Sequence, residues 1–463
     1  MTTLSAPAFS TLPLPAEQLT NLAQLGYTGM TPIQAQSLPP ILAGSDLIAQ
    51  AKTGSGKTTA FGLGLLNRLN PARWVVQALV VCPTRELAEQ VAVALRKLAR
   101  PIGNVKILTL TGGASARPQI ESLAHGAHII VGTPGRLIDL TDRELLDLSA
   151  VHTLVLDEAD RMVDMGFFND VMHIARLCPG ERQTLLFSAT FPDTIERDVE
   201  HLLRDPVRVQ VDTQHSQNQI EQRVYLVENE DKPQAVMRLL AHVKPASALV
   251  FCTTKAQCAD LCAQLRQQGF SALALHGDME QRHRDDVLMQ FTHQSCAVLV
   301  ATDVAARGLD IPALDLVINV DLARDASVHT HRIGRTGRMD AQGLAISLCT
   351  SYERPFVETL ERATGAQLKW HKLSELPSGR ISPLQAPMVT LLILGGKKAK
   401  LRAGDILGAL TGDGGLTREQ VGKITVTEQV SYVALDRRIA RSAFRHLSTI
   451  AFKGKPQRMK LLG

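Results

Sequence analysis

The sequence has few aromatic residues, no long apolar run and no signal-peptide pattern. Phe, Trp and Tyr make up 4% of the 463 residues, although hydrophobic residues together reach 45%, enough for ordinary cores. No run approaches the roughly 18 apolar residues that a membrane-spanning helix needs. Residues 1–18 contain no basic residue before an apolar stretch. We therefore expect a cytoplasmic protein with neither a signal peptide nor a membrane partner.

The cysteines follow neither a disulfide framework nor a zinc pattern. There are seven of them, an odd number, scattered among apolar residues. Cys258 and Cys262 are four residues apart, as neighbours on one face of a helix are, and no His/Cys set has zinc spacing. We interpret them as structural thiols in a reducing compartment, which leaves redox chemistry as the less favoured alternative.

The excess of positive charge is confined to the C-terminal part of the chain. Residues 385–463 contain 14 Lys and Arg against 5 Asp and Glu, a net charge of +9. The remaining 36 Lys and Arg and 40 Asp and Glu give a net charge of −4. A basic terminal domain is typical of nucleic-acid binding, and a solvated basic surface is the alternative.

Short apolar runs alternate with longer amphipathic stretches from about residue 45 to 350. In the first half, the predicted strands are Asp46–Ala51, Ala78–Pro83, Lys106–Thr111, His128–Gly132, Thr153–Asp157 and Thr184–Ser188. In the second half, they are Ala248–Cys252, Ala272–His276, Ala297–Thr302, Leu316–Asp321 and Gly343–Cys349. Nearly all are continuously apolar, which is typical of parallel strands buried on both faces. The alternation predicts two doubly wound α/β domains.

Two polar breaks suggest the domain boundaries. We expect domains at 1–207 and 223–372, a hinge at 208–222, a linker at 373–386 and a terminal domain at 387–463. The terminal pattern reads strand, helix, strand, strand, helix, strand over Met388–Leu394, Ala403–Thr411, Gly422–Thr427, Ser431–Leu435, Arg438–Leu447 and Gln457–Leu462. This order predicts a small α+β domain similar to an RRM.

A glycine-rich turn follows the first predicted strand. Its residues are Ala51-Lys52-Thr53-Gly54-Ser55-Gly56-Lys57-Thr58. The backbone N–H groups of such a loop and its lysine hold phosphate oxygens, and the following hydroxyl binds Mg²⁺. Ala51 stands where the general pattern has glycine, a small departure. The loop predicts a nucleoside-triphosphate site.

Asp157-Glu158-Ala159-Asp160 ends another apolar strand and supports the same prediction. Two carboxylates at the tip of a buried strand are costly unless a cation lies beside them. Asp157 is placed to face the metal, and Glu158 to orient an attacking water molecule. Ser188-Ala189-Thr190 follows a further strand and can hydrogen-bond back to these carboxylates.

Several other segments lie where predicted strands end, which is the ligand edge of an open α/β sheet. In the first half they are Pro83-Thr84-Arg85-Glu86-Leu87, Gly112-Gly113 and Thr133-Pro134-Gly135-Arg136, each of them weak alone. In the second half, the segment from His331 to Arg338 has four cations and no counter-charge before Asp340, which predicts a polyphosphate or RNA partner. The segment from Thr302 to Asp310 suits a ribose hydroxyl and a phosphate, with a structural ion-pair network as the alternative.

Taken in order, these segments resemble the motifs of the DEAD-box RNA helicases over roughly residues 5–370. Gln34, which ends Gly26-Tyr27-Thr28-Gly29-Met30-Thr31-Pro32-Ile33-Gln34, resembles the family's adenine-reading glutamine, with Phe9 at the usual offset upstream. The literal Asp-Glu-Ala-Asp favours RNA over the DNA-directed relatives. The resemblance implies two tandem RecA-like domains, ATP and Mg²⁺ as ligands, and an RNA-dependent ATPase that separates strands.

The resemblance also implies roles for individual residues. Catalytic roles fall to Lys57, Asp157, Glu158 and the arginine fingers Arg335 and Arg338; Thr58 and Asp157 would hold Mg²⁺. The nucleotide would further contact Gln34, residues 51–58 (Ala51, Lys52, Thr53, Gly54, Ser55, Gly56), Gly308 and Asp310, with Asp303 completing the site. Coupling to strand separation falls to Ser188, Thr190, Asp160 and His331. RNA phosphates would meet Arg85, Gly113, Thr133, Arg136, Thr254, Gly277, Gln281, Arg284 and Thr302.

The terminal domain resembles the C-terminal module of the bacterial DbpA subfamily. The resemblance rests on residues 394–402, Leu-Gly-Gly-Lys-Lys-Ala-Lys-Leu-Arg, and on residues 404–412. It implies binding to a 23S ribosomal RNA hairpin near the peptidyl-transferase centre, and a role on precursors of the large subunit. We expect Lys397, Lys398, Lys400 and Arg402 to contact the hairpin, with a solvated basic loop as the alternative. Tyr432 is the only aromatic residue on a predicted central strand.

Other functions stay open on sequence alone. The chain could be an ATP-gated RNA clamp, a general RNA helicase without ribosomal specificity, a DNA helicase, or a scaffold with a degenerate ATPase site. The presence of Lys57, Glu158, Arg335 and Arg338 argues against the scaffold. No obligate protein partner is evident.

Overall fold

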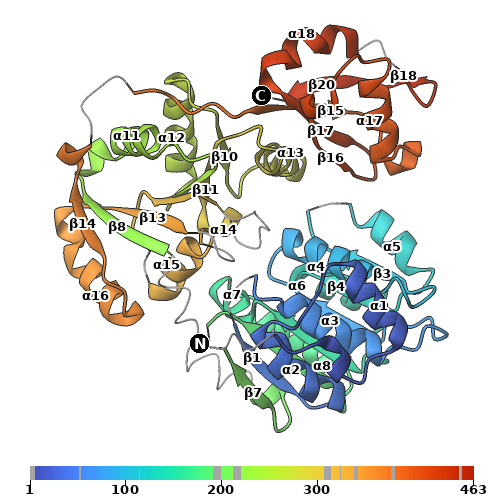
Figure 1. Ribbon diagram of the computed structural model, residues 1–463. Helices are drawn as coiled ribbons and strands as arrows, with labels where there is room; N and C mark the ends of the chain where they lie inside the picture. Colours follow the sequence, from blue (N-terminus) through green and yellow to red (C-terminus); the bar gives the residue numbers. More distant parts are fainter. Residues whose placement is uncertain are drawn as a thin grey trace. The chain divides into compact units, whose positions relative to one another are not determined.

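The structure is a computed structural model that describes residues 6–51, 54–113, 115–190, 200–211, 220–306, 314–323, 325–337, 342–376, 381–447 and 451–462. The described residues up to 211 form one compact unit, and those from 220 onward form a second. Figure 1 shows that each unit contains a sheet flanked by helices, as predicted for an α/β chain. No helix among the described residues is both long and apolar enough to cross a membrane.

The first unit is built on a seven-stranded parallel sheet with strand order β3-β4-β2-β5-β6-β1-β7. Its strands are β1 Leu47–Gln50, β2 Ala78–Val81, β3 Ile107–Leu110, β4 Ile129–Gly132, β5 Thr153–Asp157, β6 Gln183–Ser188 and β7 Val207–Gln210. Its helices are η1 Phe9–Thr11, α1 Ala16–Gln24, α2 Pro32–Ala43, α3 Lys57–Asn67, α4 Arg85–Leu98, α5 Arg117–Leu123, α6 Pro134–Asp142, α7 Ala159–Asp164, α8 Phe168–Leu177 and η2 Glu200–Leu202. Apolar clusters lie on both faces of the sheet, so its central strands are fully buried.

The second unit contains another seven-stranded parallel sheet, with order β10-β11-β9-β12-β13-β8-β14. Its strands are β8 Ile220–Leu226, β9 Ala248–Cys252, β10 Ala272–Leu275, β11 Val298–Thr302, β12 Leu316–Asn319, β13 Gly343–Cys349 and β14 Lys369–Lys372. Its helices are η3 Asn229–Asp231, α11 Lys232–Val243, α12 Lys255–Gln267, α13 Gln281–Thr292, α14 Asp303–Ala306, α15 Ala326–Ile333, η4 Ser351–Glu353, α16 Arg354–Thr364 and η5 Leu373–Glu375. The strand order repeats that of the first sheet, shifted by seven strands.

The second unit also includes the terminal domain, which has the predicted β-α-β-β-α-β order. An antiparallel sheet of order β16-β17-β15-β20 is formed by β15 Met388–Ile393, β16 Val421–Val426, β17 Ser431–Asp436 and β20 Met459–Leu462. Helices α17 Ala403–Thr411 and α18 Arg437–Leu447 share an apolar cluster with this sheet. Short elements complete it: η6 Lys397–Ala399, η7 Arg418–Gln420 and the hairpin β18 Ala451–Phe452 with β19 Lys455–Pro456.

The other face of the terminal sheet contacts α13. The Tyr432 hydroxyl donates a hydrogen bond to Asp286 Oδ1 at 2.8 Å, and the Thr390 hydroxyl donates one to Ser295 Oγ at 2.8 Å. Met289 packs on the cluster that contains Tyr432. Tyr432 is only 4% exposed. The one aromatic residue predicted on a central strand therefore packs between domains, where it cannot stack on a base.

Three strands of the two parallel sheets were not predicted, and all three carry polar residues. β7 and β8 overlap the two ends of the segment 208–222, which we expected to be an irregular hinge. β7 and β14 lie at sheet edges, where most side chains face solvent, and β8 is buried only at Val224 and Tyr225. The predicted linker also differs from expectation, because Leu376 and Ala386 are buried in the second unit. The rest of the predicted hinge, 212–219, lies outside the described residues.

The seven cysteines are all buried and unpaired. Burial raises the pKa of Cys178, Cys258 and Cys262 to about 11, so these thiols stay protonated at neutral pH. Among the described residues, no group of three or more His, Cys, Asp or Glu side chains could hold a metal ion.

Candidate nucleotide and RNA sites

The glycine-rich turn joins β1 to α3 at the carboxyl edge of the first sheet. Gly54 and Gly56 have φ angles of 82° and 96°, a region that favours glycine, and α3 begins at Lys57. The Lys57 side chain is buried and its Nζ donates to the Ala51 carbonyl oxygen at 2.6 Å. The buried Ser55 hydroxyl has no hydrogen-bond partner among the described atoms. Lys52 and Thr53 lie outside the described residues.

Gln34 lies directly against this turn. The backbone N–H of Thr31 donates to Gln34 Oε1 at 2.9 Å, and Gln34 Nε2 donates to the Gly56 carbonyl at 3.1 Å. A Cβ on Gly56 would overlap the Gln34 amide, so glycine is needed here both for its φ angle and for the space. Phe9 is buried and packs edge-on against Tyr27, with ring centroids 6.4 Å apart. The glutamine predicted to read adenine thus also positions the phosphate loop.

Asp157 ends β5 as a buried carboxylate with an unsatisfied oxygen. Its side chain is 3% exposed, and Oδ1 has no hydrogen-bond partner among the described atoms. Burial raises the pKa of Asp157 to about 7, and the positive charge of Lys57 opposes that rise. A divalent cation would satisfy Oδ1 and favour the ionised form. The residues present therefore fit a Mg²⁺ ion held by Asp157 and by Thr58, which follows Lys57 on α3.

Glu158 lies one residue further, in a left-handed conformation with φ of 55° and ψ of 51°. Its Oε2 is 2.9 Å from Nη1 of Arg161, and both side chains are nearly inaccessible to solvent. Arg161 was not among the residues predicted for the site. Its position three residues after Glu158, which directly precedes α7, was the available signal, because side chains at this spacing meet around the first turn of a helix.

The hydrogen bonds expected between Ser188-Ala189-Thr190 and the carboxylate segment are present. Asp160 Oδ2 accepts from the Thr190 N–H at 3.0 Å and from its hydroxyl at 2.9 Å. The Ser188 hydroxyl accepts from the Asp160 N–H at 3.2 Å and donates to the Thr190 carbonyl at 2.7 Å. Asp160 is therefore tied to the end of β6 rather than available to a nucleotide.

The residues predicted to contact RNA in the first unit follow β2, β3 and β4, which are neighbours in the sheet. Arg85 begins α4, and its guanidinium lies where a Cβ on Gly113 would stand. Gly113 has a φ angle of 73°. Thr133 and Arg136 lie around the start of α6, and Arg136 pairs with Asp139 at 3.5 Å. The nucleotide residues follow β1, β5 and β6, so the two groups occupy different parts of one sheet edge.

The second unit repeats this arrangement for RNA. Ala78 and Ala248 take equivalent places in the two sheets. Counting along the paired strands from these two residues matches Thr84 to Thr254, Gly112 to Gly277, and Thr133 to Thr302. Thr84 and Thr254 cap α4 and α12 through hydrogen bonds from Leu87 N at 3.3 Å and Gln257 N at 3.2 Å. Gln281 and Arg284 lie in the first turn of α13.

The cationic segment of the second unit is partly neutralised from within the protein, contrary to our expectation. Arg332 donates to both carboxylate oxygens of Asp303 at 2.7 Å. This counter-charge was missed because Asp303 is 29 residues away in sequence and approaches only in the folded sheet. Asp303, expected to complete the ATP site, is thus held by Arg332. Arg335 is buried, His331 lies on α15, and Arg338, Gly308 and Asp310 lie outside the described residues.

The terminal domain carries its predicted cations on one exposed loop. Lys397, Lys398, Lys400 and Arg402 are exposed. A Cβ on Gly396 would overlap the backbone of residues 427–429, so the loop lies tightly against that turn. The amides of Lys397 and Lys398 donate to the carbonyls of Thr427 and Glu428 at 2.9 and 3.0 Å. The backbone of this loop is therefore fixed while its side chains stay exposed, with Lys397 Nζ 3.2 Å from Glu428 Oε1.

Comparison with known families matches these regions to three family models. Residues 31–197 match the DEAD/DEAH box helicase family, residues 231–340 the helicase conserved C-terminal domain, and residues 390–461 the DbpA RNA binding domain. The chain is 50% identical to the ATP-dependent RNA helicase DbpA of Escherichia coli K12, over 98% of this chain and 99% of the relative. The chain belongs to the DbpA subfamily of DEAD-box ATP-dependent RNA helicases. It is thus an RNA-dependent ATPase and helicase with an RNA-binding terminal domain.

Other relatives share the helicase core. The DEAD-box ATP-dependent RNA helicase CshA of Geobacillus kaustophilus is 42% identical over 78% of this chain and 77% of its own length. Saccharomyces cerevisiae Dbp5 bound to RNA and ADP BeF3 has a TM-score of 0.73 and 29% identity, covering 79% of this chain and 96% of that one. Mss116p bound to ssRNA and AMP-PNP has a TM-score of 0.73 and 28% identity, covering 82% and 81%. These likenesses confirm two tandem RecA-like domains.

Proposed function

We propose that this helicase acts in the cytoplasm on 23S ribosomal RNA during assembly of the large ribosomal subunit. The observation that carries the proposal is the exposed loop with Lys397, Lys398, Lys400 and Arg402 on a domain of the DbpA RNA-binding family. Because the sheet face packs on α13, this loop offers cations to RNA without requiring the domains to separate. The domain would raise the local concentration of its target around the helicase core.

ATP hydrolysis is proposed to use the carboxyl edge of the first sheet. Lys57 would leave the Ala51 carbonyl to hold phosphate oxygens together with the loop amides, while Gln34 reads the base. Thr58 and Asp157 would hold Mg²⁺, which neutralises phosphate charge when bound. Glu158, oriented by Arg161, would accept a proton from the attacking water. Arg335 and Arg338 are proposed to stabilise charge on the transferred phosphate.

RNA contact is proposed along the other part of each edge. Threonine hydroxyls, glycine amides and arginine side chains are suited to phosphate oxygens. In the first unit these are Arg85, Gly113, Thr133 and Arg136, and in the second they are Thr254, Gly277, Gln281, Arg284 and Thr302. Ser188, Thr190, Asp160 and His331 are proposed to couple hydrolysis to strand separation.

The targeting proposal is tested by ATP hydrolysis with no RNA, with generic single-stranded RNA, and with a 23S fragment that contains the peptidyl-transferase hairpin. We expect the fragment to stimulate hydrolysis much more strongly. Replacing Lys397, Lys398, Lys400 and Arg402 together with Ala should remove this preference but keep stimulation by generic RNA. Lys369→Ala with Lys372→Ala, which removes exposed cations from β14, is the matched control. Equal stimulation by both RNAs would leave a general RNA helicase.

An ATP-gated RNA clamp is the second candidate, because the proposed RNA residues could hold a strand without separating a duplex. A displacement assay with a labelled strand next to the 23S hairpin separates the two functions. Release of the labelled strand that requires ATP supports the helicase. ATP-dependent retention of RNA without release supports the clamp.

A further inference from the structure

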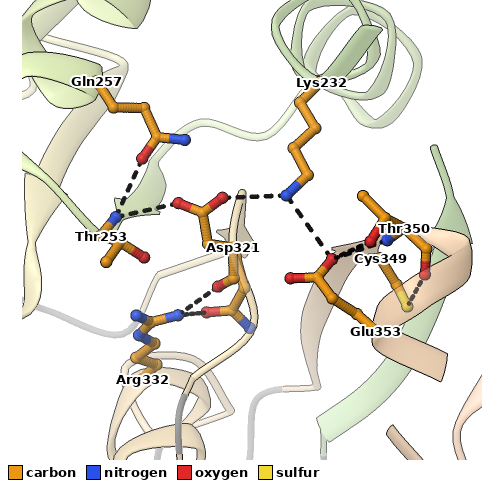
Figure 2. Close-up of polar contacts among 9 residues, drawn as sticks. Lys232, Thr253, Gln257, Asp321, Arg332, Cys349, Thr350 and Glu353 are labelled. Atoms are coloured by element: carbon orange, nitrogen blue, oxygen red, sulfur yellow. Dashed lines mark hydrogen bonds and ion pairs between the residues drawn. The ribbon is translucent and has the colours of Figure 1, made fainter. Parts of the chain in front are cut away.

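A buried ion pair lies at the carboxyl edge of the second sheet, in a place that the nucleotide and RNA assignments do not use. Lys232 is the first residue of α11 and is 4% exposed. Its Nζ is 3.0 Å from Asp321 Oδ1 and 3.9 Å from Glu353 Oε2. Figure 2 shows Lys232 pointing between these two carboxylates.

The pair stands where the first unit has its hydrolytic residues. Lys57 and Lys232 each begin the helix that follows the corresponding strand, β1 or β8. Thr153 pairs with Ala78, the first residue of β2, and Leu316 pairs with Ala248, the first residue of β9, so Thr153 and Leu316 take equivalent places. Asp321 therefore takes the position of Glu158. The two units share a lysine and a carboxylate at equivalent points of the fold.

The segment before Lys232 is nevertheless no phosphate-binding loop. The segment between β8 and α11 is Val227-Glu228-Asn229-Glu230-Asp231, which has no glycine and three carboxylates. Such a segment would repel a phosphate rather than cradle it. Lys232 is instead neutralised by Asp321. Although burial alone would raise the pKa of Asp321, the hydrogen bond and charge of Lys232 hold it below the usual range.

The second carboxylate oxygen of Asp321 holds the loop after β9. Oδ2 accepts a hydrogen bond from the Thr253 N–H at 3.1 Å. The same N–H also donates to Gln257 Oε1 at 3.2 Å, and the Gln257 N–H donates to the Thr254 hydroxyl. Figure 2 shows Asp321 between Lys232 and Thr253. Asp321 thereby fixes the backbone next to Thr254, a proposed RNA contact.

The carbonyl of Asp321 extends the same support to the loop after β11. It accepts from Arg332 Nη1 at 2.7 Å, and Arg332 holds Asp303 through two further hydrogen bonds. Asp303 directly follows Thr302, another proposed RNA contact. One residue thus links both loops that carry the threonines matched to Thr84 and Thr133 of the first unit.

We infer that Lys232 and Asp321 are positioning residues for RNA: at the place of Lys57 and Glu158 in the first unit they form an ion pair that orders the Thr254 loop, while the Asp321 backbone carbonyl supports the Thr302 loop through Arg332. The inference rests on the proposed RNA contacts of these threonines. It assigns the pair no contact with RNA or ATP. Preorganising two loops before RNA arrives lowers the cost of binding and should appear in RNA affinity.

The test is a double-mutant cycle in the full chain, read as the affinity for labelled single-stranded RNA with a non-hydrolysable ATP analogue. Thr254→Ala and Asp321→Ala should each weaken RNA binding about five- to tenfold, since each removes one or two hydrogen bonds from the contact or its support. In the Thr254→Ala background, Asp321→Ala should add less than about twofold, because residues that act through one another are not additive. Affinity for ATP without RNA should be unchanged.

Two variants separate positioning from general damage to the fold. Asp321→Asn keeps an oxygen for the Thr253 N–H but loses the charge that neutralises Lys232, so it should weaken RNA binding less than Asp321→Ala. Asp315→Ala is the matched control, because Asp315 precedes β12 and accepts from the Ala246 and Ser247 N–H groups at 2.7 and 3.3 Å at the opposite edge. We expect Asp315→Ala to leave RNA affinity unchanged, even if it lowers the melting temperature.

The possible outcomes separate failure of the positioning role from failure of the proposed RNA contact at Thr254. If Thr254→Ala leaves RNA affinity unchanged, the proposed RNA contact is wrong and the inference falls with it. If Thr254→Ala weakens binding but Asp321→Ala and Asp321→Asn do not, only the positioning role is overturned. Full additivity of the two changes, or an equal loss in Asp315→Ala, would also overturn it.

Discussion

The two parallel sheets of this helicase have the same strand order but use the lysine and the carboxylate at matched places differently. In the first unit, Lys57 donates to the Ala51 carbonyl and Glu158 lies 2.9 Å from Arg161 Nη1, while the adjacent Asp157 keeps an oxygen with no hydrogen-bond partner among the described atoms. In the second, Lys232 and Asp321 lie 3.0 Å apart and neutralise each other. The first sheet edge thus keeps groups that a charged ligand could satisfy, whereas the charges at the matched place of the second edge neutralise each other. The threonines and glycines proposed to contact RNA, in contrast, recur in both units.

The end of the sixth strand shows the same asymmetry. Ser188 ends β6 and exchanges hydrogen bonds with Asp160 and Thr190. The register places Cys349 at the equivalent position of β13, where its thiol donates to the adjacent Thr350 carbonyl. The link to the carboxylate at the place of Glu158 is indirect in this unit: the Thr350 N–H donates to Glu353 Oε2 at 2.8 Å, and Lys232 lies between Glu353 and Asp321. The residues proposed to contact RNA thus recur in both units, whereas the links between strand end and carboxylate segment differ.

The largest predicted difference between the units concerns their lysines. Lys57→Ala should abolish measurable ATP turnover, because it removes the side chain proposed to hold phosphate oxygens. Lys232→Met should retain turnover at saturating RNA, since Lys232 pairs with Asp321 and Glu353 and is assigned no contact with the nucleotide. Steady-state phosphate release checks both. Glu158→Gln should behave like Lys57→Ala in turnover while still binding ATP, and turnover near the wild-type rate in either variant would falsify the site assignment.

The next prediction addresses the direct hydrogen bonds between the end of β6 and Asp160 in the first unit. Ser188→Ala with Thr190→Ala removes the side-chain hydrogen bonds that tie Asp160 to β6. We expect ATP turnover to fall only a fewfold while duplex displacement falls at least about tenfold, which is the free-energy scale of one to two lost hydrogen bonds. The two rates are measured on the same preparation. A parallel loss of both would mean that the segment supports the nucleotide site and not the coupling.

Much of this architecture could be predicted from sequence because buried parallel strands are continuously apolar. Thr153–Asp157, Ala248–Cys252 and Gly343–Cys349 were predicted with their observed bounds. β7 and β14 were missed because edge strands expose polar side chains, as Lys369–Lys372 does. The strand propensity and hydrophobic periodicity of a sequence reflect burial, so they do not identify a strand whose side chains are exposed to solvent.

The candidate site was predicted where local chemistry is unusual and missed where it depends on distant partners. A glycine turn ending in Lys57 and the carboxylates after β5 stand out in any sequence. Lys232 and Asp321 do not, since each looks like an ordinary charged residue at the end of an element. Their pairing, and that of Arg332 with Asp303, arises only when the sheet brings strand ends together. Ligand-binding loops can be recognised from a short stretch of sequence, whereas internal ion pairs between distant residues can be recognised only once the fold is known.

A smaller effect is expected from replacing the glycines proposed to contact RNA at the two sheet edges. Gly113→Ala should weaken RNA binding about five- to tenfold, because the residue has a φ angle of 73° and a Cβ would displace the Arg85 guanidinium. Gly277→Ala, in the second unit, should change affinity less than about twofold, since nothing lies within 4 Å of an added Cβ. Titration of labelled single-stranded RNA checks both, and an equal loss would show that the second unit uses its glycine for close approach of the RNA backbone.

The smallest predicted effect concerns pH and the unsatisfied carboxylate of the first unit. The pKa of Asp157 is about 7 in the folded protein against an ordinary value of 3.8, so the folded state favours the protonated form. Its contribution to stability is present at low pH and is lost as the pH rises through about 7.

Asp157→Asn mimics the protonated form. Without nucleotide, this variant should melt a few degrees above the wild type at pH 8, with a smaller difference at pH 6. Mg²⁺ and an ATP analogue should reverse the order at pH 8, because the ionised carboxylate then gains a cation that Asn binds poorly. A variant that melts lower than the wild type at both pH values without ligand would contradict the cost that we assign to burying the ionised Asp157. The same comparison at Asp321, whose pKa is lowered by Lys232, should give the opposite sign, since Asp321→Asn leaves a buried lysine without its main partner.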